Sequence, residues 1–249
     1  MNFLHDERFA GSKSSENKAR LSSPSMYSQY TEEQLQKNTK GFYNRVAKRC
    51  IDFILALILI IICTPFFLII TIAIAAQDGF PVLYKAPRGG YHNMTFKICK
   101  FRSMVKNADK IGGYTTAFHD PRVTKVGAVL RKSKFDEIPQ LINILKGEMS
   151  FVGPRPEVLE YVNRFKGLEK YILEVRPGIT DYSSIKFANL DELVGEKNAD
   201  EFFQKEILGQ KNALRVRYVA EISIGTDVKI FFLTVWTVLK RVISTVKGK

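Results

Sequence analysis

An apolar segment of 26 residues, 51–76, constrains the fold of this chain more than any other feature. Asp52 is its only charged residue, and about 20 such residues are enough for a helix to cross a bilayer. Thr64-Pro65 lies at its centre, where proline removes a backbone donor and kinks or breaks a helix. Basic residues flank both ends, and basic flanks favour the cytoplasmic side. The segment therefore predicts a re-entrant membrane hairpin, 41–78, broken at Thr64 and Pro65, with both ends on one face.

Two other arrangements of this segment stay open. A proline-kinked helix would cross the membrane completely and leave the C-terminal part of the chain outside. A helix buried in a soluble core is disfavoured by the length and apolarity of the segment. A second apolar segment, 228–241, contains Trp236 and ends in two basic residues. It is too short to span a bilayer, which favours an interfacial amphipathic helix or a buried core helix.

The remaining pattern predicts a helix-rich α+β protein. Residues 1–40 are rich in polar side chains without an apolar period, which predicts a disordered polar tail. Residues 79–249 are expected to form a cytosolic domain with short strands and interfacial amphipathic helices. Strands are expected at 80–84 and 95–102, and helices at 125–131, 136–146, 156–174 and 190–222.

Positive charge is concentrated in one part of the chain. The formal net charge is +13, and residues 85–134 hold twelve Lys or Arg and two acidic residues, a local charge of +10. Such a cluster suits nucleic acid, an anionic membrane surface or a phosphorylated substrate, or it forms a solvated face. Few aromatic residues interleave these bases, which argues against nucleic acid. The three cysteines lie far apart and predict neither disulfides nor a zinc site.

Within and after this basic region, an acidic pair lies among cations. Asp136 and Glu137 follow Arg131, and a rigid turn follows with Arg155 between two prolines. An Asp kept ionised by a helix N-terminus and nearby cations is a nucleophile toward phosphorus. The neighbouring Glu would hold a cation such as Mg²⁺ or accept a proton. Adjacent acids also occur at helix N-termini simply because they complement the helix dipole.

Several cations are expected to bind phosphate around this pair. The prolines beside Arg155 lower the entropy cost of presenting its guanidinium. Lys97, Lys100 and Arg102 are expected on one strand face, and Arg131 lies about one helical turn before the acids. Arg176 begins an Arg-Pro-Gly turn. Together they would neutralise a nucleotide diphosphate.

The chain resembles the bacterial sugar transferase family, the monotopic polyprenyl-phosphate phosphoglycosyl transferases. The resemblance runs from about residue 43 to residue 241 and includes the membrane segment, whose helix in this family is broken at a Ser-Pro or similar pair. It rests on four ordered motifs, which are Lys97 to Met104, Phe135 to Leu141, Leu145 to Pro156 and Val175 to Thr180.

The resemblance implies a two-step reaction with magnesium. Asp136 would attack the β-phosphate of a UDP-sugar and release UMP, with Glu137 assisting the pair and the metal. Polyprenyl (undecaprenyl) phosphate would then take the sugar-phosphate from the aspartate. Lys100, Arg131 and Arg155 would bind phosphate, and Arg88 resembles the arginine of a family turn.

The resemblance also implies a place and a role in the cell. The enzyme would lie in the bacterial inner membrane with its catalytic domain on the cytoplasmic face. It would start a lipid-linked glycan for exopolysaccharide, capsule, O-antigen or glycoprotein and pass it to downstream glycosyltransferases. A homo-oligomer is one option for its assembly, and nucleic acid is not an expected partner.

Two departures from the family pattern leave the sugar open. Pro87 stands where a glutamine is common, and residues 181–187 replace a usual run after Thr180.

A different class of function is the alternative hypothesis, a membrane-tethered basic module that recruits nucleic acid or anionic lipid. That hypothesis accounts for the charge but has no use for the acidic pair.

Overall fold

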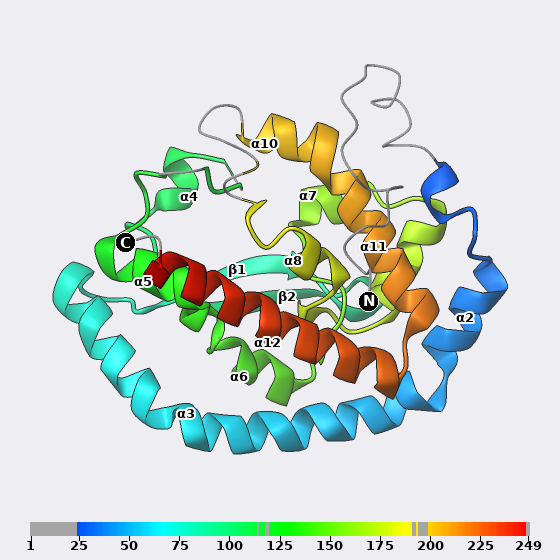
Figure 1. Cartoon of the computed structure of the whole chain (residues 1–249), viewed down its shortest axis with the longest axis horizontal. Helices are drawn as coiled ribbons and strands as arrows, with labels where there is room; N and C mark the ends of the chain where they lie inside the picture. Colours follow the sequence, from blue (N-terminus) through cyan, green and yellow to red (C-terminus); the bar gives the residue numbers. More distant parts are fainter. Residues whose placement is uncertain (1–23, 114, 118–119, 191–192, 194–198, 248–249) are drawn as a thin grey trace.

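The chain folds into a helix-rich body with two small sheets, bordered by one long apolar helix (Figure 1). The computed structural model describes residues 24–113, 115–117, 120–190, 193 and 199–247. The α-helices are α2 Glu32–Lys40, α3 Lys48–Asp78, α4 Ala108–Ile111, α5 Lys125–Ser133, α6 Gln140–Lys146, α7 Leu159–Val162, α8 Tyr182–Lys186, α10 Ala199–Phe202, α11 Leu208–Glu221 and α12 Ile224–Lys247. Short 3₁₀ or π turns are η2 Pro24–Tyr27, η3 Tyr43–Ala47, η4 Tyr91–Asn93, η5 Phe135–Glu137, η6 Gly167–Glu174 and η7 Phe203–Ile207.

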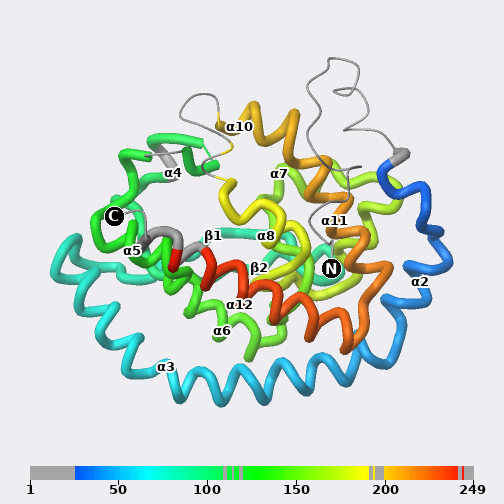
Figure 2. Tube along the Cα trace, in the orientation of Figure 1, coloured from blue at the N-terminus to red at the C-terminus, as the bar shows by residue number. Residues whose placement is uncertain are grey.

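The apolar segment forms one continuous helix, α3, with Pro65 inside it. The predicted interruption at Thr64-Pro65 is therefore wrong for this structure. Figures 1 and 2 show α3 as an arc along the lower edge of the molecule. Proline removes one intrahelical hydrogen bond without ending a helix whose flanks are held by packing. The hydroxyl of Thr64 donates to the carbonyl of Ile60 at 2.8 Å and so stays within the helix.

Both ends of α3 attach to the same body. Near its start, Arg49 donates to the carbonyls of Ile144 and Leu145 at the end of α6, at 2.6 and 2.8 Å. Near its end, the side-chain oxygen of Gln77 accepts from the backbone of Val126 in α5, at 2.9 Å. The concave side of α3 thus packs against α6 and α5.

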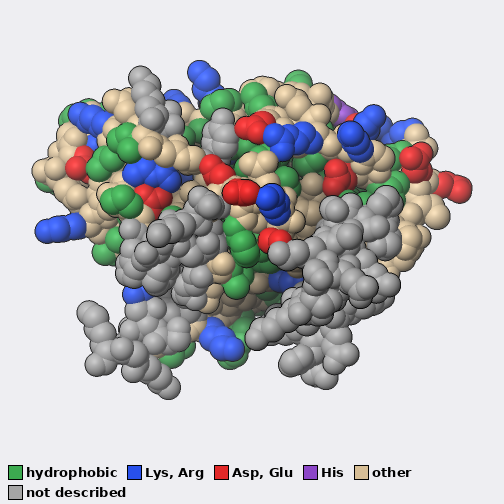
Figure 3. Space-filling view, turned by 90° about the horizontal axis from the view of Figure 1, so that it is seen from above, with side chains coloured by type: hydrophobic (Ala, Val, Ile, Leu, Met, Phe, Trp, Pro, Cys, Tyr) green, Lys and Arg blue, Asp and Glu red, His purple; other side chains and the backbone are tan. Residues whose placement is uncertain are grey.

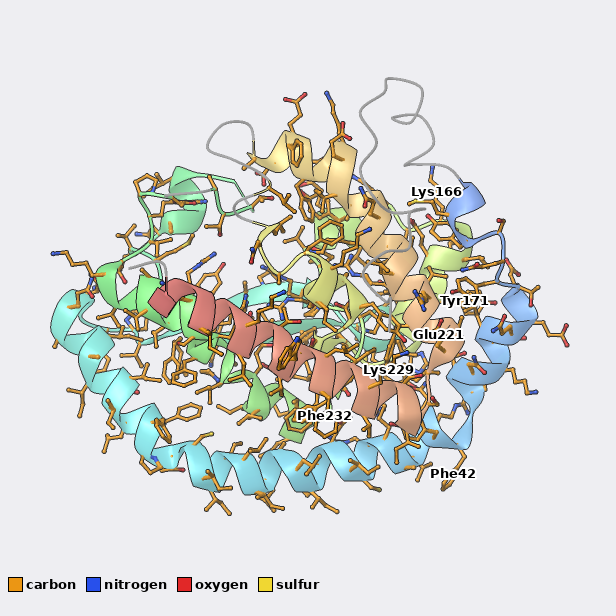
Figure 4. All side chains as sticks on the ribbon, in the orientation of Figure 1. Phe42, Lys166, Tyr171, Glu221, Lys229 and Phe232 are labelled. Carbon is orange, nitrogen blue, oxygen red and sulfur yellow. The ribbon has the colours of Figure 1, made fainter. Side chains whose placement is uncertain are left out.

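The convex side of α3 is apolar and exposed. Its large side chains include Ile61 at 67% and Leu68 at 63% exposure, and the helix is long and apolar enough to cross a membrane. Figure 4 shows the side chains of α3 pointing away from the body along the lower edge. On the opposite face, seen in Figure 3, charged side chains are scattered among apolar ones. The molecule therefore has one apolar edge of a kind that folded soluble proteins rarely expose.

Two small sheets organise the body. Strands β1 Leu83–Gly89 and β2 Thr95–Phe101 form an antiparallel hairpin, so β2 confirms the strand expected at 95–102 while β1 begins later than the strand expected at 80–84. Strands β3 Ser150–Val152 and β4 Gly178–Thr180 pair in parallel. One face of the hairpin packs in a core shared with α3 and α6, formed by Ala56, Ala86, Phe96, Ile98, Leu141, Ile144 and Met149.

The predicted disordered tail, 1–40, is folded over its last part. Helix α2 places Leu35 in the main core, where it is fully buried, and Asn38 donates to the carbonyl of Ala220 at 2.6 Å. Thr31 caps the helix through the backbone of Gln34. The disorder prediction is therefore wrong for α2, while residues 1–23 lie outside the described part of the chain.

The second apolar segment lies within α12, which begins and ends beyond the limits 228–241. Its Ile230 is fully buried in the main core, whereas Phe232 and Trp236 are 65% and 67% exposed. Figure 4 shows Phe232 projecting from the side of α12 that faces away from α11. Asp227 in the first turn pairs with Lys48 of α3, so α12 starts beside the start of the apolar helix.

Candidate active site

The acidic pair lies in a single turn between two helices. Helix α5 ends at Ser133, and the left-handed backbone of the next residue, Lys134 (φ 61°), turns the chain into η5. Asp136 and Glu137 are thereby buried, at 6% and 7% exposure. The expected helix over 136–146 instead begins at Gln140. The hydroxyl of Ser133 donates to the carbonyls of Val129 and Leu130 and so stays within α5. The pair therefore lies in the one-turn 3₁₀ helix η5 that precedes α6, whereas the sequence predicted that it begins the longer helix itself.

Glu137 is held by two cations. Its Oε1 accepts from Lys100 at 3.1 Å and from Arg155, and its Oε2 accepts from the other terminal nitrogen of Arg155 at 2.9 Å. Burial alone would raise the pKa of Glu137, but the charges of Arg155 and Lys100 hold this pKa well below its usual range. Glu137 is therefore a firmly ionised carboxylate.

Asp136 is in the opposite situation. Its Oδ1 is buried and has no hydrogen-bond partner in the described structure. Burial raises the pKa of Asp136 above its ordinary value, an effect that the charge of Lys100 opposes. The sequence predicted an Asp stabilised as an anion, and this direction is a correction to that expectation. A buried carboxylate oxygen without a hydrogen-bond partner is costly unless a ligand or metal ion satisfies it, and the charges of Lys100, Lys134 and Arg131 act on the same carboxylate.

The structure brings three of the five predicted phosphate-binding residues to the pair. Lys100 and Arg155 contact Glu137 directly. Arg131 donates to the hydroxyl of Thr116 at 2.7 Å, and its charge acts on Asp136. Lys134 is a further cation, not among the five predicted phosphate-binding residues, and the charges of both carboxylates act on it.

The other two predicted cations lie elsewhere. Arg88 donates to the carbonyl of Pro87 at 2.8 Å, and its charge acts on Glu157. Arg176 donates to the carbonyl of Gly147 at 3.1 Å, and its guanidinium lies 4.7 Å from the centre of the Tyr91 ring. Arg176 therefore stabilises the turn after α6. Among the described residues, no contact joins Arg176 to the acidic pair.

The predicted common face of Lys97, Lys100 and Arg102 is wrong. Successive side chains of a strand alternate between faces, so Lys97 and Lys100 lie on opposite sides of β2. Lys97 lines a surface groove of about 360 Å³ with Lys85 and Lys146. Arg102 donates to the carbonyls of Gly79 and Pro81.

A buried network that the sequence reasoning missed supports the Arg155 turn. Glu157 pairs with the fully buried Arg215 of α11, and Lys211 lies 3.8 Å from the same carboxylate oxygen. The backbone carbonyl of Glu157 accepts from Gly89 of β1 at 3.1 Å. These contacts join the turn to α11 and to the hairpin. No local sequence signal marks Arg215, because its partner is distant in the chain.

Comparison with known proteins agrees with this arrangement. A profile described as Bacterial sugar transferase matches residues 43–241, most of the chain. The chain belongs to this family. The expectation drawn from its four motifs is thereby confirmed.

Relatives of this sugar transferase have named activities. It is 37% identical over 197 residues to the UDP-glucose:undecaprenyl-phosphate glucose-1-phosphate transferase of Escherichia coli (strain K12), a match that covers 78% of this chain and 40% of that protein. It is 34% identical over 198 residues to the UDP-N-acetylgalactosamine-undecaprenyl-phosphate N-acetylgalactosaminephosphotransferase of Aeromonas hydrophila, covering 77% and 43%. The exopolysaccharide production protein ExoY of Sinorhizobium fredii is 36% identical over 159 residues, covering 58% and 70%. The matched region is less than half of the first two relatives.

The departure at residues 181–187 has a structural role in this sugar transferase. Asp181 is fully buried and caps α8 by accepting from the backbone of Ser184 at 2.7 Å. Its other oxygen accepts from the backbone of Arg155 at 3.2 Å. The changed run thus lies directly behind the Arg155 turn.

Proposed function

We propose that this chain transfers a sugar-1-phosphate from a UDP-sugar to polyprenyl (undecaprenyl) phosphate through an aspartyl-phosphosugar intermediate. One observation carries the proposal: the carboxylate of Asp136 is buried, its Oδ1 has no hydrogen-bond partner among the described residues, and the charges of Lys100, Lys134 and Arg131 act on it. Cations positioned around an anionic group hold it in place and stabilise charge that develops during transfer. The named activities of two relatives point to the same reaction.

The chemistry takes two displacements at phosphorus. In the first, an Asp136 oxygen forms a bond to the β-phosphorus, and the bond from this phosphorus to the bridging oxygen breaks. UMP leaves with that oxygen and its electron pair. In the second, a phosphate oxygen of polyprenyl phosphate bonds to the same phosphorus and the bond to Asp136 breaks. The products are a polyprenyl diphosphate sugar and a regenerated carboxylate.

The donor set fits a magnesium ion in part. The described residues contain no group of three His, Cys, Asp or Glu side chains that would enclose a metal. Mg²⁺ usually takes one or two carboxylates plus substrate phosphates, and the free Oδ1 of Asp136 suits this mode. When bound, Mg²⁺ would neutralise charge on the diphosphate. Glu137 fits less well, because both of its oxygens are already paired.

We propose a monotopic position for the enzyme on the cytoplasmic face of the bacterial inner membrane. Support comes from α3, whose two ends attach to one body while its convex side is apolar and exposed. A helix that crossed the bilayer would place its ends on opposite sides. The exposed apolar residues of α12 fit an interfacial helix. A protease-accessibility assay on tags at both termini would overturn this position if the tags lay on opposite sides.

An aromatic pair offers the lipid acceptor a route to the site. Phe66 of α3 and Phe135 of η5 make an edge-to-face contact at 6.4 Å between ring centres, and both rings are about half exposed. Phe135 immediately precedes Asp136. An isoprenoid chain in the bilayer would therefore meet apolar surface up to the residue beside the nucleophile.

The test is UMP release from a panel of UDP-sugars, with undecaprenyl phosphate in detergent micelles or vesicles. We expect one or a few sugars to support UMP release and lipid product. Asp136→Asn should abolish both the product and the covalent protein adduct seen by mass spectrometry. A lipid product from Asp136→Asn would refute the proposal. Salt-dependent binding of RNA without UMP release from any UDP-sugar would favour the basic binding module instead.

The product would enter a lipid-linked glycan pathway and pass to downstream glycosyltransferases. The name of the Sinorhizobium fredii relative points to exopolysaccharide production. The panel of UDP-sugars would identify the transferred sugar. Measuring the size of the purified protein in solution would give the assembly state of the enzyme.

A further inference from the structure

Helix α12 has two faces of different character. Its outer face is apolar and exposed and carries Val228, Phe231, Phe232, Val235, Trp236 and Leu239. Figure 4 marks this side by the label of Phe232. The opposite face buries Ile230 in the main core, and the helix contacts β3, β4, α5 and α8. Helix α12 therefore lies between the surface proposed to meet the lipid and the strands beside the Arg155 turn.

One side-chain hydrogen bond joins α12 to β4. The hydroxyl oxygens of Thr180 in β4 and Thr234 in α12 lie 2.7 Å apart. The hydroxyl of Thr234 also donates to the carbonyl of Ile230, one turn earlier, at 2.8 Å. A hydroxyl has one proton to donate, so Thr180 is the donor and Thr234 the acceptor of the bond between them. Thr180 is buried, and Thr234 is the only acceptor of its hydroxyl proton among the described residues.

Strand β4 in turn holds the Arg155 turn. The carbonyl of Thr180 accepts from the backbone of Gly153 at 2.9 Å. The carbonyl of the preceding residue, Ile179, accepts from the guanidinium of Arg155, and that guanidinium also pairs with Glu137. A displacement of β4 would therefore move the Arg155 guanidinium relative to the acidic pair.

We propose that α12 is a positioning element for Arg155, and that a lipid surface on its outer face acts on the active site through the hydrogen bond between Thr180 and Thr234. An amphipathic helix binds a lipid surface more strongly the more apolar area it buries there, so lipid contact fixes α12. Thr234 then holds β4, and β4 holds the guanidinium that meets the phosphate. This inference rests on the proposed function, because it concerns the same site and the same membrane position.

The test measures kcat for UMP release in phosphatidylethanolamine and phosphatidylglycerol vesicles that contain undecaprenyl phosphate, and Tm in detergent micelles. Thr234→Val removes the acceptor and leaves the buried Thr180 hydroxyl without a partner. Its kcat should fall by roughly 3- to 10-fold, which is the worth of one neutral hydrogen bond. Its Tm should fall by roughly 2–12 °C, because an unpaired buried donor also costs stability.

The double variant Thr180→Val with Thr234→Val separates positioning from stability. Replacing both partners of a hydrogen bond by apolar groups of similar shape is nearly neutral for stability. The Tm of the double variant should therefore return to within about 2 °C of wild type, while its kcat stays as low as that of Thr234→Val. A residue with a structural role alone would recover kcat together with Tm, and that result would overturn the inference.

Two further variants are matched controls. Thr237 lies in the same helix and donates to the carbonyl of Leu233 at 2.8 Å, as Thr234 does to Ile230, but it has no partner in β4 among the described residues. Thr237→Val should leave kcat unchanged. Thr234→Ser keeps the hydroxyl and should retain the kcat of wild type. A loss in either control equal to that of Thr234→Val would contradict the role of the Thr180 contact.

The effect of the lipid is tested on the outer face. Trp236→Ala removes apolar area there, and its kcat is counted per vesicle-bound molecule. It should lower kcat by about two- to threefold in the wild-type background and should have no further effect in the double threonine variant, because coupled changes are non-additive. The same result in both backgrounds, including no loss in either, would overturn the inference.

UMP release by wild type separates the two levels of the argument. An active wild type whose threonine variants are also fully active refutes only the coupling through α12. A wild type that binds the vesicles but releases no UMP from any UDP-sugar refutes the proposed function.

Discussion

The pairing of Lys48 with Asp227 offers a quantitative test of how α3 is attached. Asp227 is 8% exposed and accepts from the ammonium of Lys48, from the hydroxyl of Tyr43 at 2.6 Å and from that of Tyr218 at 2.8 Å. Lys48 is 6% exposed. In Asp227→Asn the amide oxygen still accepts from a tyrosine, but the lysine charge stays buried without its anion. Removing one partner of a buried pair costs about 3–5 kcal/mol.

The expected change is large enough for thermal unfolding in detergent micelles. At roughly 2–4 °C per kcal/mol for a domain of this size, the Tm of Asp227→Asn should fall by roughly 6–20 °C. The double variant Lys48→Met with Asp227→Asn should recover part of this loss, because the buried lysine charge that lost the Asp227 carboxylate is then also removed. Glu201→Gln is the matched control, since Glu201 pairs with Lys205 on the exposed surface and its loss should leave Tm unchanged. A Tm of Asp227→Asn within about 2 °C of wild type would refute the reasoning.

Three further outcomes follow from the structure. Lys100→Gln should slow UMP release by roughly 10- to 100-fold, because it removes a charged contact near the transferred phosphate. Lys97 lies on the other face of β2, so Lys97→Gln should leave the rate unchanged. Equal losses in both variants would contradict the assignment of Lys100 to the active site. Leu35→Ala should destabilise the protein by about 2–5 kcal/mol in denaturant unfolding, and a neutral result would contradict the packing of α2. Burial lowers the pKa of Lys211 to about 8. Between pH 8 and about 10, the side chain of Lys211 therefore binds more protons in the unfolded chain than in the folded protein. The contribution of Lys211 to stability rises with pH over this range. The free energy of unfolding of wild type relative to Lys211→Met should therefore increase over this range, and a flat difference would contradict it.

The chemistry-bearing residues were readable from the sequence because they lie within short motifs. Asp136, Glu137 and Arg155 were identified together, and the structure brings them together with Lys100. Arg176 was placed at the same site only because it begins a Pro-Gly turn. Its contacts with Gly147 and Tyr91 depend on tertiary packing that no local pattern records.

Three other differences have separate causes. Helix α2 carries a single large apolar residue, Leu35, so its period is too weak to predict burial against α11. Side chains alternate between the two faces of a strand, which puts Lys97 and Lys100 on opposite faces. The prediction of a common face was therefore an error in reading the sequence. Pro65 did not end its helix because the helix is fastened on both sides of it, at Arg49 and at Gln77.

The attachment of α3 at both ends has a mechanical consequence for the membrane proposed to hold it. Such a helix displaces acyl chains in the near leaflet and leaves the far leaflet complete. Each bound molecule therefore adds area to one leaflet only, which favours curvature toward the cytoplasm and makes binding sensitive to lipid packing. Loosely packed or strongly curved cytoplasmic leaflets should gather the enzyme, and with it the sites where its lipid product is made.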